Sequence, residues 1–420
     1  MTITTFGAII GLSVSIILII KKFEPFYCLV FGALVGGIVG GADLVSTVEY
    51  MANGAQSMAP AILRVMTSGF LAATLIKTGA VDRISEEIIK ILGIKKSILG
   101  IVLSAMVLSA VGVDLDVVVL TVGPIGMSIG HKLGYSKLAI LLAALGGGKA
   151  GNIISPNPNT LAAATNFNVD LSSVMLANIV PAICGVLVTT VLAKTLINKV
   201  SKINIDIDID IQEDENLPSL FASIIGPIVA ICLLFLGNVS SIVVDPLVAL
   251  PVGAIVCIIA TKNLVHTKEY LSYGVEKMQG VCILLLGTGT LVGIIQMSNL
   301  QHSTISLLDT LSIPQFLLAP ISGMVMSLAT ASTTGGATIA SSTFSSAILN
   351  SGLSGIAGAS MVNAGACVFE HLPHGALFHA STKSVSMDLI ERFKLIHYEI
   401  AIGLVIVFVS TIMQFFMMSL

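Results

Sequence analysis

The stretch LAILLAALGGGKAGNIISPNPNTLAAA, Leu138–Ala164, is long and apolar enough to enter a bilayer, but glycine, asparagine and proline interrupt it at its centre. Backbone N–H and C=O groups find no water in hydrocarbon, so a broken span is tolerated only where it lines a cavity walled by protein. Counting about 1.5 Å per residue from Leu138 places Lys149 roughly 16 Å into a hydrocarbon core about 30 Å thick. This stretch therefore predicts a helical membrane protein with a polar site near the middle of the bilayer.

The composition extends this prediction to the whole chain. Its 420 residues are 55% hydrophobic and only 10% charged, and the mean hydropathy is +1.00. So little charge cannot give a water-soluble fold of this size an ordinary polar surface, which argues against a soluble enzyme. The formal net charge of -3 leaves no basic surplus for binding nucleic acid.

The basic residues indicate how the chain crosses the membrane. If Lys21 and Lys22 are cytoplasmic, and the segments 97–130 and 314–349 each enter and leave on one side, no Lys or Arg falls in an outside loop. This topology places Lys277 and Arg392 in inside loops. Arg64 lies near the outer end of its span, so we expect its long side chain to reach the interface. The pattern predicts a multi-pass protein of a prokaryotic inner membrane, with both termini outside.

The same topology predicts an internal repeat. Each half contains about five spans plus a helical hairpin, and the odd number of crossings makes the two halves inverted relative to each other. Gly54 and Gly69 recur as Gly274 and Gly289 at a constant spacing. The expected fold class is thus all-α, with interrupted helices from both repeats meeting near the midplane. The predicted divisions are a first transmembrane repeat at 1–197, an acidic cytoplasmic linker at 198–218 and a second transmembrane repeat at 219–420.

Polar interruptions fall at corresponding places in the two repeats. They are Gly112–Asp116, Gly146–Thr160, Ala331–Gly336 and Glu370–Gly375. Half-helix N-termini with free backbone N–H groups, together with Ser, Thr and Asn side chains, suit a small anion. The predicted substrate-binding residues are Lys149, Asn152, Ser155, Asn157, Asn159, Thr160, Ser332, Thr333, Thr334, Gly335, His371 and His374. The predicted proton carriers are Asp114, Asp116 and Glu370, because removal from water favours a protonated carboxyl group.

Several of these residues have a second interpretation. Lys149 either binds the substrate carboxylate or forms a permanent ion pair with Asp114 or Asp116, and Asp114 could instead cap a helix. His371 and His374 have a spacing found in metal sites, but no third ligand is near, so we expect no metal and no other cofactor. No nucleophile signature supports an intramembrane enzyme.

The interruptions resemble the motifs of the gluconate permease family, the hydroxy-acid symporters of the larger ion transporter superfamily. Asp116 and Pro124 are similar to an acidic residue and a proline of that family. The run from Ser155 to Ala164 resembles its proline-rich loop leading into a Leu-Ala-Ala-Ala helix, although Asn157 and Asn159 stand where members more often have His and Gly.

Two further segments carry the resemblance. Thr333–Thr338 is similar to the small-residue hairpin tip of the family, and His371–Ala376 is closer to relatives that resemble hydroxybutyrate permeases than to gluconate permeases. The resemblance implies a homodimer that imports a small hydroxy-monocarboxylate, gluconate-like or hydroxybutyrate-like, by proton symport with alternating access. Na⁺/H⁺ antiport and Na⁺-coupled symport of an organic anion are the alternatives.

Overall fold

The computed structural model describes residues 3–93, 96–199, 217–240, 242–300, 303, 306, 310, 314–373 and 375–418. Helices make up the regular structure of these residues, and an isolated bridge joins Ile3 and Ser298. The prediction of an all-α fold is therefore confirmed. The predicted linker, apart from its two first and two last residues, lies outside the described residues, and the proposed division of the chain remains a prediction.

The described residues of the first half form eleven named helices. They are α1 (Thr5–Ile20), α2 (Pro25–Val39), α3 (Leu44–Ser57), α4 (Ala59–Lys77), α5 (Ala80–Leu92), α6 (Ser97–Ala110), α7 (Leu115–Leu133), α8 (Lys137–Asn152), α9 (Pro158–Asn166), α10 (Leu171–Ala177) and α11 (Ile179–Leu196). The predicted span 138–164 is thus two helices, α8 and α9, separated by the Ser-Pro-Asn break, since proline cannot donate a backbone hydrogen bond to the helix.

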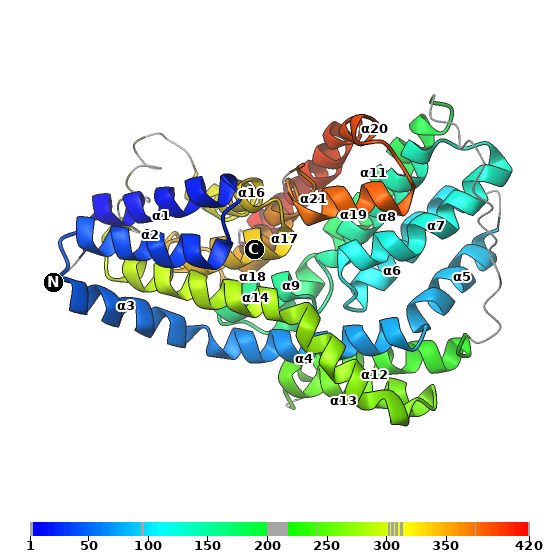
Figure 1. The fold of residues 1–420 in the computed structure, drawn as a ribbon, viewed down its shortest axis with the longest axis horizontal. Coiled ribbons are helices and arrows are strands. Elements are labelled where there is room, and N and C mark those ends of the chain that lie inside the picture. Colours follow the sequence, from blue (N-terminus) through cyan, green and yellow to red (C-terminus); the bar gives the residue numbers. More distant parts are fainter. Residues whose placement is uncertain are drawn as a thin grey trace.

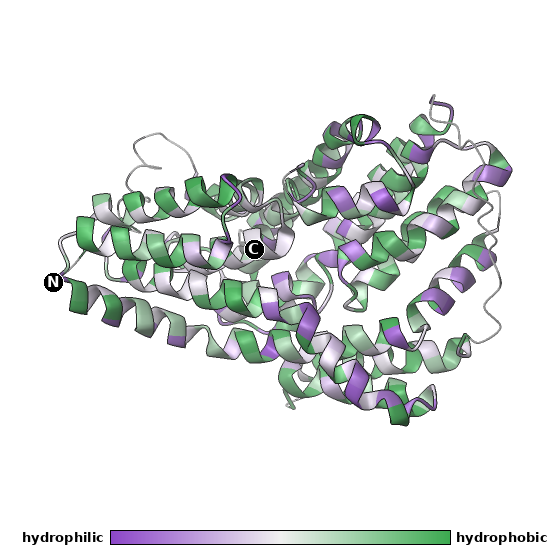
Figure 2. Cartoon of the chain, in the orientation of Figure 1, coloured by the Kyte–Doolittle hydropathy of each residue, from purple (hydrophilic) through white to green (hydrophobic). Residues whose placement is uncertain are grey.

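The second half repeats this order. Its helices are α12 (Leu220–Val239), α13 (Pro246–Ala260), η2 (Leu264–His266), α14 (Thr267–Gln296), η3 (Gln315–Leu317), α16 (Leu318–Thr330), α17 (Thr333–Asn350), α18 (Gly355–Ala366), α19 (Ala376–Ser384), α20 (Leu389–Phe393) and α21 (Ile396–Met418). Among the described residues, five helical segments are long and apolar enough to cross a membrane: α4, α11, α12, η2–α14 and α20–α21. Hydrophobic residues dominate α1 and α2, whereas hydrophilic residues are interspersed in α5 and α19 (Figure 2).

Helix starts in the two halves match closely. Both α2 and α13 have 15 residues, and both α9 and α19 have nine. Four N-cap positions of the first half have counterparts in the second half, and the sequence distance between the two members is the same in every pair. The four pairs cover the hairpins and the breaks that follow them. The pairs are Asp114 and Ser332, Ser136 and Ser354, Asn157 and Gly375, and Asp170 and Asp388.

Corresponding helices run in opposite directions where they meet. Gly54 on α3 packs against Gly289 on α14, and Gly69 on α4 packs against Gly274; a Cβ added to Gly289 or Gly274 would lie 2.7 Å from the facing carbonyl oxygen. Since Gly54 matches Gly274 and Gly69 matches Gly289 in sequence, exchanging the halves exchanges the two contacts. An inverted pair of repeats requires this geometry, and small residues permit the close approach of the backbones.

The helices group into two bundles. We call α1–α4 with α12–α14 the frame bundle, and α6–α11 with α16–α21 the break bundle, because the interrupted helices belong to it. In Figure 1, α1, α2, α14 and α3 lie side by side, and α6, α7 and α8 form a separate group. The bundles meet along a seam where α14 contacts α17 and α4 contacts α9.

Candidate functional site

Both hairpins turn sharply at their tips. Between α6 and α7 the turn contains Gly112, whose φ of +104° favours glycine. Between α16 and α17 it contains Ala331 at φ +46°, followed by Ser332, whose Oγ accepts a hydrogen bond of 3.2 Å from the Gly335 N–H. Asp114 occupies the N-cap position of α7, but its side chain makes no capping hydrogen bond. Capping therefore does not account for this carboxyl group.

A cavity of about 460 Å³ lies between the two tips and the two breaks. Asp114, Asp116, Asn152 and Glu370 line it together with Ser332, Thr333 and Thr334. The sequence distance that separates the paired N-caps also separates residues on the two sides of this cavity. The cavity walls therefore consist of matched positions from the two halves, which are Asp114 and Ser332, Asp116 and Thr334, and Asn152 and Glu370. Residues predicted from far-apart sequence segments thus share one cavity.

Other predicted binding residues lie behind the cavity wall. Ser155, Asn157, Asn159 and Thr160 are buried and do not line the cavity. Gly335 is also buried, and its N–H is already bonded to Ser332. His374 lies outside the described residues.

The buried asparagines join the breaks of the two halves. Asn159 Nδ2 donates to Asn363 Oδ1 at 2.8 Å, and Asn363 Nδ2 donates to Thr160 Oγ1 at 3.1 Å. Asn157 Nδ2 donates to Asn152 Oδ1 at 2.9 Å. These contacts hold the start of α9 against α18 and orient Asn152 at the cavity wall. Sequence analysis missed Asn363, which lies inside an otherwise apolar run.

Lys149 is fully buried, and its ammonium group has three close partners. Nζ donates to Cys367 O at 2.7 Å and to His371 Nδ1 at 2.9 Å, and lies 3.2 Å from Glu370 Oε1. An ammonium group only donates, so His371 Nδ1 must accept and Nε2 carries the proton that bonds Ile396 O at 3.2 Å. The ion pair of Lys149 is with Glu370, in place of the predicted partners Asp114 and Asp116.

A second buried ion pair lies beyond His371. Arg392 binds both carboxylate oxygens of Glu399, and its Nε donates to Ser381 Oγ at 2.9 Å. The guanidinium also lies 4.9 Å from the centre of the Phe378 ring. Arg392 was expected in an inner loop, but its side chain is fully buried. The bidentate contact with the Glu399 carboxylate explains how the buried charge of Arg392 is tolerated.

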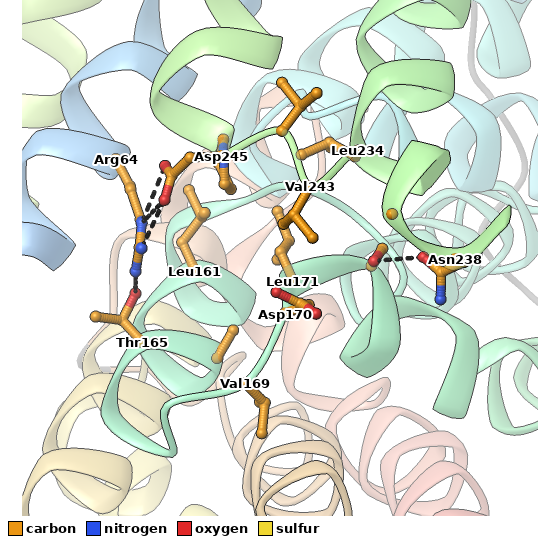
Figure 3. A pocket seen from close by; sticks show the side chains of 15 residues that line it. Arg64, Leu161, Thr165, Val169, Asp170, Leu171, Leu234, Asn238, Val243 and Asp245 are labelled. Atoms are coloured by element: carbon orange, nitrogen blue, oxygen red, sulfur yellow. Dashed lines mark hydrogen bonds and ion pairs between the residues drawn. The ribbon is translucent and has the colours of Figure 1, made fainter. Parts of the chain in front are cut away.

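A smaller cavity of about 90 Å³ lies in the part of the seam that the distribution of basic residues predicts to face outside (Figure 3). Arg64 on α4 binds Asp245 at 2.7 Å and donates to Thr165 on α9 at 2.9 Å. Ser172 on α10 donates to Asn238 on α12 at 2.9 Å. Arg64 therefore has specific partners, whereas the sequence suggested only that it reaches the interface.

These contacts join the bundles and fix the charge of Asp245. Burial alone would raise the pKa of the Asp245 carboxyl group, but hydrogen bonds from Arg64 and from the Leu247 N–H, with the charge of Arg64, hold it below its usual value. We call the Arg64–Thr165 and Ser172–Asn238 contacts the outer latch.

Broken helices from two matched halves around a polar cavity, at a seam between two bundles, define a membrane transporter. The chain belongs to the GntP family of permeases, since the family described as "GntP family permease" matches residues 2–419.

The chain is also similar to individual proteins. The chain is 49% identical over 411 residues, 98% of both chains, to an "Uncharacterized transporter" of Haemophilus influenzae. It is 25% identical over 325 residues to an "Uncharacterized permease" of the same organism, covering 68% of this chain and 66% of that protein. The crystal structure of the Alcanivorax borkumensis YdaH transporter has a similar fold, with a TM-score of 0.64, 13% identity and coverage of 90% and 89% of the two chains.

Proposed function

We propose that this permease imports a small hydroxy-monocarboxylate by proton symport. The observation that carries the proposal is the charge of the central cavity. Asp114 and Asp116 line it, and Lys277 is the basic residue among its described lining, while the Glu370 charge is offset by Lys149. A substrate carboxylate entering beside two ionised aspartates would be repelled, so its binding favours simultaneous uptake of a cation.

The polar groups suit a hydroxy acid. Ser332, Thr333 and Thr334 present hydroxyl groups at the N-terminus of α17, where the helix dipole also favours negative charge. Asn152 adds an amide from the opposite half. Hydroxyl and amide groups can bond both the carboxylate and the substrate hydroxyls. A cavity of about 460 Å³ is within the usual size range for small-ligand sites.

Transport would proceed by movement of the break bundle against the frame bundle. The outer latch joins the bundles on the side of the seam where α4 meets α9 and α10 meets α12, so this state corresponds to a closed outer side. The orientation, with both termini outside, rests on the distribution of basic residues. Two copies would form the homodimer that the family resemblance implies.

The function is tested by uptake into proteoliposomes. Radiolabelled gluconate, glycerate, 3-hydroxybutyrate and lactate are each offered under an imposed pH gradient and, separately, under a Na⁺ gradient. We expect accumulation of at least one hydroxy-monocarboxylate driven by the pH gradient. Accumulation driven only by the Na⁺ gradient would identify Na⁺, not H⁺, as the coupling ion. Flux of Na⁺ or H⁺ without any carboxylate would favour an antiporter.

Removing the outer latch should favour an outward-open state. Thr165→Val with Ser172→Ala deletes two hydrogen bonds between the bundles, each worth about 1 kcal/mol, so the equilibrium should shift by on the order of tenfold or more. Opening is measured with a cysteine introduced by Leu161→Cys, at a buried position that lines the smaller cavity beside the outer latch. This cysteine is labelled from outside by a membrane-impermeant thiol reagent. Faster labelling is expected in the latch variant.

The neighbouring Ser173 provides the control for this experiment. It lines the adjoining polar cavity and is not part of the latch, so Ser173→Ala with Leu161→Cys should label at the parent rate. Because the pKa of Asp245 is lowered, the Arg64 ion pair is present above the usual Asp range and is lost only as pH falls below it. Both labelling rates rise with pH because the thiolate is the reactive form, but the ratio of the latch-variant rate to the parent rate should be constant from about pH 5 to pH 8. A ratio of one would contradict the latch.

A further inference from the structure

Lys277 is a cavity residue that the sequence placed among the inner loop charges. It lies within α14, ten positions after Thr267 and therefore about 15 Å along the helix. Its side chain lines the central cavity on the frame side, next to Val281. Because Lys277 lines the cavity, its charge needs an explanation beyond the one that applies to the inner loops, where basic residues only set the orientation of the chain.

Lys149 is poorly suited to bind a substrate anion. Its ammonium group donates to Cys367 O and His371 Nδ1 and lies 3.2 Å from Glu370 Oε1, and its side chain has no exposed surface. Binding a substrate there would separate a buried ion pair, which is costly in a low-dielectric environment. The ammonium group of Lys149 is therefore already engaged with other groups of the protein.

Lys277 has the opposite properties. Its ammonium group makes no hydrogen bond or ion pair with the residues that the structure describes, and its close contact is the Tyr273 ring, 5.3 Å from Nζ to the ring centre. It is exposed at the cavity, and its charge acts on both Asp114 and Asp116. A flexible ammonium facing two carboxyl groups across a cavity is available for a third carboxylate.

We propose that Lys277 binds the substrate carboxylate, which rests on the carboxylate transport proposed above. Lys277 belongs to the frame bundle, whereas Asp116 and Ser332 belong to the break bundle. The substrate therefore bridges the two bundles, with its carboxylate on Lys277 and its hydroxyl groups at the start of α17. Protonation of the aspartates removes their competition for the ammonium group, which links proton binding to substrate binding.

The test is charge replacement at this position. Lys277→Cys should raise the KM for the accumulated carboxylate by about 10- to 100-fold, the usual range for losing a charge-assisted hydrogen bond. Treatment with 2-aminoethyl methanethiosulfonate restores a positive side chain and should return most of the affinity, whereas methyl methanethiosulfonate should not. Substrate should also slow the labelling of this cysteine.

The matched control is Lys268→Cys, an exposed lysine on the same helix that does not line the cavity. Its KM should stay within about threefold of the parent with either reagent. The parent protein, treated with the same two reagents, shows how much modification of the native cysteines changes the KM. An unchanged KM in Lys277→Cys, or a loss that neither reagent distinguishes, would overturn the assignment while parent uptake still supports carboxylate transport. Absence of uptake by the parent would overturn both.

Discussion

Asp116→Asn is expected to abolish accumulation driven by a pH gradient, reducing it roughly 100-fold, while substrate exchange across the membrane continues. Asp116 lines the central cavity at the start of α7. Asparagine is close in shape to a protonated aspartate and cannot release a proton, so the cavity would bind the carboxylate without a coupled ion. The measurement compares gradient-driven uptake with counterflow in the same proteoliposomes.

The control for this variant is Asp388→Asn. Asp388 is exposed before α20, makes no side-chain capping bond and does not line the cavity. It should retain both activities. Accumulation by Asp116→Asn at the parent level would show that the proton is carried elsewhere, with Asp114 the next residue to replace. Loss of counterflow together with uptake would mean that Asp116 is needed for binding itself.

The fold was accessible from sequence because its main constraint is local. Hydrocarbon admits a broken helix only around a cavity, so the Gly, Pro and Asn residues near Lys149 and near Glu370 indicated the breaks directly. The two hairpins and the helix order follow the predicted pattern. The close contacts of Gly54 and Gly69 with Gly289 and Gly274 involve glycines that the sequence comparison of the two halves had singled out, because close backbone contact requires small residues there.

The site was only partly accessible, because depth along a helix does not tell which way a side chain points. Asp116 and Asn152 were predicted and line the cavity, whereas Asn157 has the same polarity and faces the protein interior. Asn363 and the Arg392–Glu399 pair were missed because their partners are distant in sequence. Buried polar groups need partners, but a sequence alone does not show which partners the packing provides.

Lys149→Met should strongly destabilise the protein. The substitution leaves Glu370 as a buried carboxylate without its counter-ion and removes the donor to Cys367 O and His371 Nδ1. Breaking a buried ion pair by removing one partner typically costs about 3–5 kcal/mol. We expect the apparent Tm in detergent to fall by on the order of 10 °C. Lys194→Met, an exposed lysine near the end of α11, should change it little.

A double-mutant cycle separates this role from substrate binding. Glu370→Gln removes the unpaired charge, so combining it with Lys149→Met should recover more than half of the lost stability, and the coupling energy measures the pair. Added substrate should not change that coupling, because Lys149 does not line the cavity. If Lys149→Met were as stable as the parent and lost substrate affinity instead, Lys149 would be the carboxylate ligand and its contact with Glu370 would be secondary.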